Sequence, residues 1–200
     1  MATVREIPSG SDIMSVSNDL TIRRLAKAEG FLTLGLPGKA LEILNSRSNW
    51  SSMPYEANLL AGLAYRELGE FLQAISHLEK AAKLKPNEPD VALALGWCYK
   101  RTNRLAQAID SLSKAVKAHR DMPILNYNLA CYWSLAGHVS KAVEHLQVAI
   151  RNAPEYVQMV DAETDFDPIR TDPVFQALIQ LESGESHRTK TTMKPHRRSE

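Results

Sequence analysis

The stretch GLAYRELGEFLQAISHLEKAAKLKP, residues 62–86, contains two helices joined by a short turn. Gly62 and Tyr65 lie three residues apart, so they share one face of the first helix. Gly69 occupies the turn, where the end of a helix requires a residue that tolerates a positive φ. Pro86 ends the second helix, whose packing stripe at i, i+4 and i+7 holds Ala74, Leu78 and Ala81. The stretch therefore predicts an antiparallel pair of helices.

The same pattern recurs every 34 residues without gaps, in units that begin at Thr21, Tyr55, Pro89 and Pro123. The small position of the first helix holds Ala28, Gly62, Gly96 and Ala130, and the aromatic position holds Phe31, Tyr65, Tyr99 and Trp133. The turn position holds Gly35, Gly69, Asn103 and Gly137. The stripe of the second helix holds Ala40, Ala74, Ala108 and Ala142, then Leu44, Leu78, Leu112 and Leu146. Such periodicity predicts stacked repeats, here over residues 21–54, 55–88, 89–122 and 123–156.

These columns resemble the tetratricopeptide repeat (TPR) family, whose 34-residue unit has a small and an aromatic residue in its first helix and alanine with a large apolar residue in its second. The resemblance covers residues 21–156. It implies an all-α fold, a right-handed α-solenoid of four helix-turn-helix repeats whose first helices line a concave face. Where the family usually has apolar or small residues, the first repeat has Arg24, Lys27 and Arg47, so we interpret it as a solvent-facing cap.

The sequence after the fourth repeat predicts a closing segment over residues 157–182, which looks like the capping helices of bacterial TPR arrays. Asp167-Pro168 and Asp172-Pro173 each combine a helix N-cap residue with a proline at the first helical position. The helix that follows has an apolar face made of Val174, Phe175, Leu178, Ile179 and Leu181. The expected organisation is a disordered segment, one ordered domain and a disordered basic tail, over residues 1–18, 19–182 and 183–200.

The composition argues against several classes of protein. Lys and Arg total 24 and Asp and Glu total 23, so the domain as a whole is not an electrostatic clamp for nucleic acid or an anionic membrane. No apolar run reaches the ~18 residues of a membrane span, and the first twenty residues lack the apolar stretch of a secretory signal. Cys98 and Cys131 are too few for a disulfide framework and suit a reducing compartment. We expect a cytoplasmic protein without membrane contact.

Motifs for catalysis and for metal or cofactor binding are missing from the sequence. GLPGKA at residues 35–40 resembles a phosphate-binding loop, but Thr33 and Ala40 stand where that loop needs glycine and Ser or Thr. The acidic run between residues 161 and 167 lacks the central glycine and final glutamate of an EF-hand. His77 and His145 lie two repeats apart, too far to share a zinc ion, and are expected to be solvated or partly packed. We expect no catalysis, small-molecule substrate, cofactor or metal.

The family resemblance places partner-binding residues on the first helices, a few positions on either side of the small residue. Carried onto this chain, the candidates are Leu25, Glu29, Leu59, Leu63, Arg66, Leu93, Trp97, Lys100, Tyr127 and Cys131. The middle of this face is apolar and charged residues border it, which suits an extended peptide or an amphipathic helix of a partner protein. The alternative is that some of these residues pack within the repeat stack or are covered by the chain's own tail.

The function predicted from these patterns is a non-catalytic scaffold or adaptor for a protein partner. Chaperone adaptors of the family hold a C-terminal carboxylate with Lys and Asn, and no such clamp is expected because those positions here cannot donate a hydrogen bond. They are occupied by Leu25, Glu29, Leu60, Asp90 and Ala94. Two alternatives stay open. One is a structural or assembly subunit of a larger complex, and the other is weak nucleic-acid association through five cations in residues 188–198.

Overall fold

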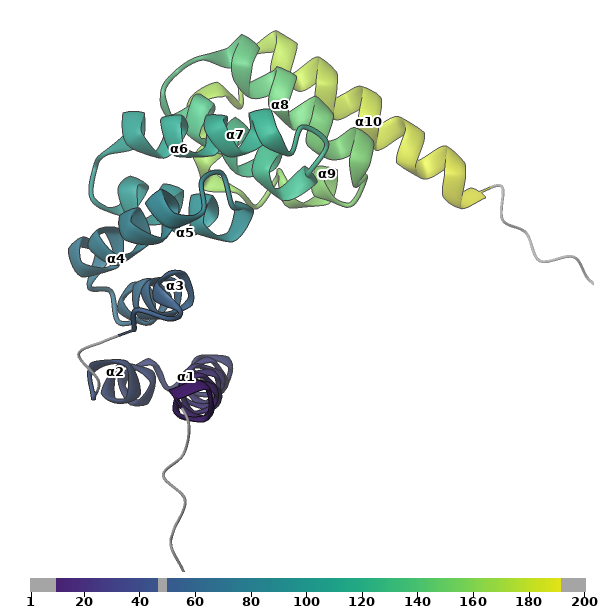
Figure 1. The fold of residues 1–200 in the computed structure, drawn as a ribbon. Coiled ribbons are helices and arrows are strands. Elements are labelled where there is room, and N and C mark those ends of the chain that lie inside the picture. Colours follow the sequence, from purple (N-terminus) through teal and green to yellow (C-terminus); the bar gives the residue numbers. More distant parts are fainter. Residues whose placement is uncertain (1–9, 47–49, 192–200) are drawn as a thin grey trace, which may run out of the picture. The chain divides into compact units, whose positions relative to one another are not determined.

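The computed structural model describes the backbone of residues 10–46 and 50–191, and its regular elements there are all helices (Figure 1). The predicted all-α class is confirmed. The chain divides into two compact units, Met1–Thr102 and Asn103–Glu200. The predicted disordered residues 1–9 and the last nine residues of the basic tail lie outside the described part of the chain.

The described residues of the first unit form five helices, and each one packs against the next. They are α1 (Gly10–Thr33), α2 (Pro37–Asn45), α3 (Pro54–Glu67), α4 (Phe71–Leu84) and α5 (Pro89–Arg101). Two further contacts join α1 to α3 and α3 to α5. The first helices of successive repeats therefore lie side by side within this unit.

The second unit begins with α6 (Leu105–Ala118), followed by the pair α7 (Pro123–Leu135) and α8 (Val139–Asn152). The closing segment adds α9 (Tyr156–Met159), the 3-10 helix η1 (Thr164–Ile169) and α10 (Pro173–Thr191). Helix α10 packs against α8 and α9, whereas η1 packs against α7. The closing segment thus covers two different faces of the α7–α8 pair.

The four turns between paired helices have the backbone conformation that their residues predict. Gly35, Gly69, Asn103 and Gly137 have φ angles of 67°, 78°, 59° and 74°. A positive φ is costly for a residue with a branched or bulky side chain, which explains why glycine and asparagine recur here. The second helices α4, α6 and α8 begin at Phe71, Leu105 and Val139, so the 34-residue step of the sequence is also the step of the structure.

The small and apolar columns form the core. The alanines and leucines of the second-helix stripe are buried in all four repeats. Gly62 shows why the small position must be small: a Cβ atom there would lie 2.6 Å from Cγ of Leu78 and 3.3 Å from the carbonyl oxygen of Ala74. The two helices of this repeat therefore approach too closely for any larger residue.

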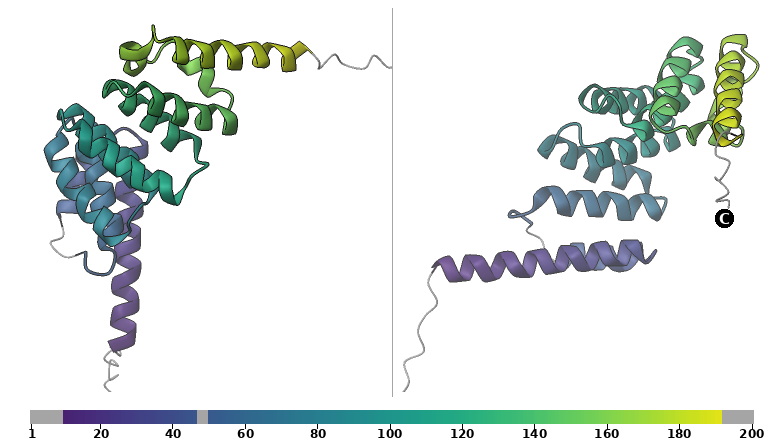
Figure 2. Two further views of the ribbon diagram at one scale, coloured as in Figure 1. Left: turned by 90° about the horizontal axis from the view of Figure 1, so that it is seen from above. Right: turned by 90° about the vertical axis from the view of Figure 1, so that its right-hand side faces the viewer.

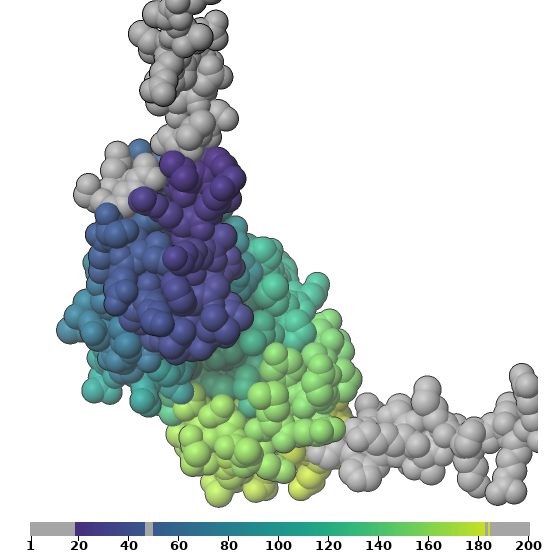
Figure 3. Space-filling view, turned by 90° about the horizontal axis from the view of Figure 1, so that it is seen from below, coloured from purple at the N-terminus to yellow at the C-terminus, as the bar shows by residue number. Residues whose placement is uncertain are grey.

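The first repeat differs from the others at both ends. Helix α1 begins at Gly10 rather than at the predicted boundary near Asp19, because no proline stands between Pro8 and Pro37 to interrupt it. It runs past the other helices of its unit (Figure 2). Arg24 and Lys27 are exposed, and the outer face of α1 and α2 forms part of the molecular surface in Figure 3. This agrees with the interpretation as a cap, although Arg47 lies outside the described residues.

The closing segment confirms one predicted cap and corrects the other. Asp172 caps α10, where its Oδ1 accepts a hydrogen bond of 2.9 Å from the backbone N–H of Val174. Asp167 is not an N-cap. It lies inside η1, and its carboxylate binds the guanidinium of Arg170 at 3.0 Å. Glu163 caps η1 instead, by accepting a hydrogen bond from the N–H of Asp165.

The apolar face of α10 is narrower than predicted. Phe175 and Leu178 are buried and Ile179 is half-buried, whereas Val174 and Leu181 are exposed. The helix continues to Thr191, past the predicted end of the ordered domain at Glu182, since no proline interrupts it there.

Candidate functional site

The accessible part of the predicted groove lies on α3 and α5 of the first unit. We call it the α3–α5 face and define it by Leu59, Leu63, Arg66, Leu93, Trp97 and Lys100. Each α5 residue of this set follows its α3 counterpart by 34 residues, and the two helices are in contact. The side chains therefore form matching rows on neighbouring helices. Five of the six are half-buried and Trp97 is 36% exposed.

The Trp97 ring contacts two neighbouring side chains, Phe71 and Arg101. The Phe71 ring meets it edge-on, with a centroid distance of 5.2 Å. The Arg101 guanidinium lies 5.4 Å from the Trp97 centroid and 5.7 Å from that of Phe71. Such cation–π contacts pre-organise an aromatic residue at a surface. Phe71 was not among the predicted site residues, although its apolar position at the start of a second helix recurs as Leu105 and Val139.

Three predicted groove residues are corrected by the structure. Leu25 is only 5% exposed and packs in a core cluster with Leu60 and Ala61. Tyr127 and Cys131 are 4% and 2% exposed. Helix α7 packs against η1, and the Tyr127 ring contacts Phe166 of η1. These three residues are packing residues in the folded chain, so the prediction that they line an open groove is wrong. Glu29 is exposed on α1, and its place in a binding groove stays a prediction.

The cover over α7 is aromatic. The Tyr127 ring lies 4.8 Å from that of Tyr156 and meets Phe166 edge-on at 5.7 Å. Burial, followed by nearby negative charges such as that of Glu163, raises the pKa of Tyr127 above its usual value. Its hydroxyl and that of Ser134 are buried without a hydrogen-bond partner among the described residues. The chain's own closing segment thus covers this face, which is one of the two alternatives that the sequence left open.

The cysteines are buried and free. Burial raises the pKa of the Cys98 thiol to about 11, so Cys98 is protonated at neutral pH. A protonated buried thiol is a poor nucleophile and a poor metal ligand. Cys98 therefore serves as a small apolar residue of the core.

Two histidines take part in the same hydrogen bond in two repeats. His77 Nδ1 lies 3.1 Å from Asn58 Oδ1, and His145 Nδ1 lies 3.0 Å from Asn126 Oδ1. Asn58 donates its amide to the carbonyl of Pro54, so its Oδ1 is the acceptor and the histidine Nδ1 must carry the proton. The prediction that these histidines are partly packed is confirmed.

Stability should fall as these histidines are protonated. Burial, followed by Lys80, lowers the pKa of His77 below 6.5. Burial also lowers the pKa of His145; Glu144 opposes this shift and Lys141 adds to it. The unfolded chain then binds more protons just below pH 6.5, so the free energy of unfolding decreases as the pH falls through that value.

We expect the urea midpoint to be lower at pH 5.5 than at pH 7.5, and the difference to shrink in a His77→Gln/His145→Gln variant. Glutamine can still donate to the asparagine without titrating near neutral pH. An equal loss of stability in the wild type and the double variant would contradict this assignment.

Sequence and structure comparisons agree with the repeat architecture. The family model described as "Tetratricopeptide repeat" matches residues 65–130. Residues 65–130 therefore match this family. Among curated proteins, no sequence matches it.

Solved structures of MamA have a similar fold. A double mutant titled MamA RS-1 has a TM-score of 0.68 and 20% identity, covering 85% of this chain and 96% of its own. A second MamA structure has a TM-score of 0.63 and 19% identity, with 74% and 86% covered. MamA from Desulfovibrio magneticus has a TM-score of 0.61 and 20% identity, with 82% and 96% covered. At these identities the likeness concerns the fold alone.

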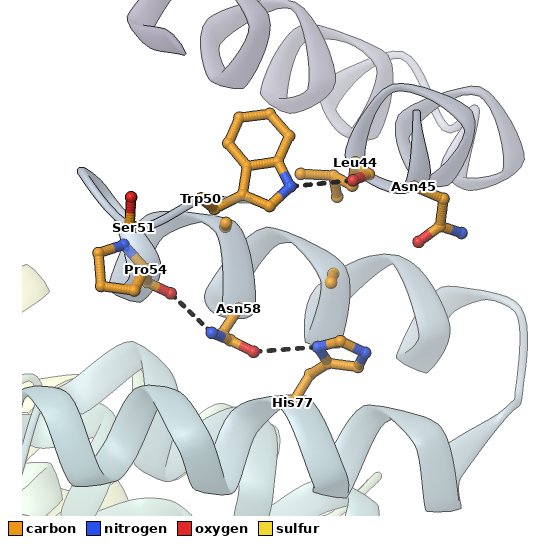
Figure 4. A pocket seen from close by; sticks show the side chains of 9 residues that line it. Leu44, Asn45, Trp50, Ser51, Pro54, Asn58 and His77 are labelled. Carbon is orange, nitrogen blue, oxygen red and sulfur yellow. Dashed lines mark hydrogen bonds between the residues drawn. The ribbon is translucent and has the colours of Figure 1, made fainter. Parts of the chain in front are cut away.

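The first unit also has a cavity of about 480 Å³ between α2, α3 and α4, which sequence reasoning missed (Figure 4). Trp50, Leu44 and Asn45 lie on one side, and Pro54, Asn58 and His77 on the other; Ser51, Ala57 and Ala61 complete the lining. Two features of the sequence create it. Helix α2 has nine residues where α4 has fourteen, and Ala61 stands where the next repeats have the buried leucines Leu95 and Leu129.

Filling this cavity should stabilise the protein. We expect Ala61→Leu to raise the free energy of unfolding by about 0.5–2 kcal/mol, because the new side chain buries apolar area in existing space. The urea midpoint followed by circular dichroism measures the effect. Ala64→Leu is the matched control on the same helix: Ala64 is fully buried outside the cavity lining, so overpacking there should cost about 1–3 kcal/mol. A loss in both variants would show that the space cannot accept a leucine.

Within residues 19–46 and 50–182, no group of three or more His, Cys, Asp or Glu side chains is arranged to hold a metal ion. In the described part of the chain, none of the helices has the length and apolarity needed to cross a bilayer.

Proposed function

We propose that this protein is a non-catalytic scaffold that binds a peptide or helix of a partner protein on the α3–α5 face. TPR folds serve protein recognition in general. The observation that carries the finer proposal is the partly exposed Trp97 beside Leu63 and Leu93, held by Phe71 and Arg101. An apolar row with a fixed aromatic anchor and charged borders fits a partner segment with one or two apolar side chains. The buried free cysteines support a cytoplasmic location.

The experiment compares two double variants. Leu63→Ser/Trp97→Ser changes the α3–α5 face. The control, Leu72→Ser/Leu84→Ser, changes two exposed leucines of α4. Each tagged chain captures proteins from host lysate, and the protein enriched by the wild type is purified and titrated by calorimetry. We expect the first variant to lose about 2 kcal/mol or more of binding free energy, roughly a thirtyfold change in Kd, and the control to bind like the wild type.

Circular dichroism melts of both variants accompany the titration. Equal binding by all three proteins would move the function away from this face. Unfolding of the first variant alone would show that Leu63 and Trp97 belong to the core, which would also contradict the proposal.

A further inference from the structure

The second unit shows what kind of segment rests on a first helix of this protein. Tyr127, Cys131 and Ser134 of α7 stand 34 residues after Leu93, Trp97 and Lys100 of α5. The surface that is open on α5 therefore has a counterpart on α7, where η1 of the closing segment covers it. The cover has an acidic composition, DAETDFDPI over residues 161–169, which contains four carboxylates and no cation.

The anchor of this cover is Phe166. Its side chain is fully buried and meets the rings of Tyr127 at 5.7 Å and Phe175 at 5.4 Å. The residues on both sides of it are aspartates, and neither is buried. Asp167 binds Arg170 at 3.0 Å. The occupant thus combines one buried aromatic ring with flanking carboxylates, at least one of which pairs with a guanidinium.

The α3–α5 face has the groups to receive the same combination. Trp97 and Leu63 offer apolar surface for an aromatic ring. Arg66 and Arg101 stand near the C-terminal ends of α3 and α5, and neither forms an ion pair within the described residues. By contrast, Arg170 is paired with a carboxylate. Two guanidiniums without carboxylates beside an aromatic anchor are complementary to an acidic segment, since arginine binds carboxylates in a planar two-point geometry.

From charge complementarity and the composition of the α7 cover, we infer what occupies the α3–α5 face. The occupant is an acidic segment of a partner protein in which carboxylates flank a central aromatic residue, as in Asp-Phe-Asp. The aromatic ring rests on Leu63 and Trp97, and the flanking carboxylates bind Arg66 and Arg101. This inference rests on the proposed function, because it names the partner chemistry of the same face. It concerns side-chain carboxylates inside a segment and requires no terminal carboxylate.

The test uses the intact protein and a labelled peptide with the sequence of residues 161–169, acetylated and amidated so that its ends are uncharged. Fluorescence anisotropy measures Kd for this peptide and for two variants of it, Phe166→Ala and Asp165→Asn/Asp167→Asn. We expect saturable binding that weakens tenfold or more with either peptide variant. Binding of the acidic peptide should also weaken with added salt, as charge pairs at a surface do.

Protein variants then identify the site. Arg66→Gln/Arg101→Gln should raise the Kd of the acidic peptide about tenfold and leave the Kd of the Asp→Asn peptide unchanged. In a double-mutant cycle this result indicates direct pairing of the arginines with the aspartates. The control Arg24→Gln/Lys83→Gln removes the same charge from exposed positions outside the face and should bind like the wild type. If the glutamine variant does not fold, Arg66→Lys/Arg101→Lys replaces it and should weaken the acidic peptide more than the Asp→Asn peptide.

Three results would overturn the inference: no binding of the acidic peptide, equal binding of the acidic and Asp→Asn peptides, or equal binding by the wild type and the arginine variants. The last result would show that the peptide binds elsewhere on the protein. The proposed function is tested separately with the captured partner. If Leu63→Ser/Trp97→Ser abolishes binding of that partner but the acidic peptide does not bind the wild type, the proposed function is supported and only the acidic class of partner is excluded.

Discussion

Replacing Phe166 by alanine is expected to lower the free energy of unfolding by about 3–5 kcal/mol. The side chain is fully buried between α7 and α10, where it contacts the rings of Tyr127 and Phe175. Its removal loses the free energy gained by transferring an aromatic ring from water into the core. It also leaves a cavity that the surrounding helices fill only in part. The substitution should also expose Tyr127, so the second unit loses both core and cover.

Hydrogen exchange of α7 peptides, read by mass spectrometry, locates the effect, and urea denaturation gives its size. We expect faster exchange in α7 and little change in α1 and α2. The control is Val174→Ala in the same closing segment: Val174 is 58% exposed, so its truncation should change stability by less than about 0.5 kcal/mol. Similar losses in the two variants would mean that Phe166 is not the anchor of this segment.

The second large effect is expected at Gly62. A Cβ atom there would lie 2.6 and 2.8 Å from two carbons of the Leu78 side chain, closer than such atoms approach. Leu78 is itself fully buried, so it has no free space to move into. Overpacking of this kind typically costs about 1–3 kcal/mol, and it outweighs the gain of up to about 1 kcal/mol that alanine has over glycine inside a helix. We therefore expect Gly62→Ala to lower stability by about 1–2 kcal/mol.

The same substitution at Gly30 is the matched control. Gly30 also lies inside a helix, but no atom would lie within 4 Å of a Cβ placed there. Gly30→Ala should therefore raise the free energy of unfolding by about 0.5–1 kcal/mol through helix propensity alone. Opposite signs for the two variants, measured by urea denaturation, would establish helix contact as the cause. A gain in both would show that α3 and α4 separate easily enough to accept a methyl group.

The candidate site was only partly predictable from sequence. Position within the repeat predicted that Leu63 and Trp97 share one face, because a helical period fixes which side chains share a face, and both side chains are partly exposed. The same rule failed for Tyr127 and Cys131, whose positions in the repeat are equivalent to those of Leu93 and Trp97. Their burial depends on η1, which follows the repeats and obeys no repeat period. Phe71 was missed because a second-helix residue becomes part of the face only through its contact with Trp97.

The amino-acid sequence alone was sufficient to predict the local architecture of the repeats. Three features could be predicted residue by residue, because each depends on contacts within one repeat or between neighbouring repeats. They are the turn residues that need a positive φ, the small residues where helices approach, and the 34-residue stripe of alanine and leucine. The sequence did not show which of the equivalent first-helix surfaces is exposed, because this depends on packing in three dimensions. Cover by η1 and the cavity beside the short α2 depend on how separate segments meet, and burial of apolar area acts without regard to their distance along the chain.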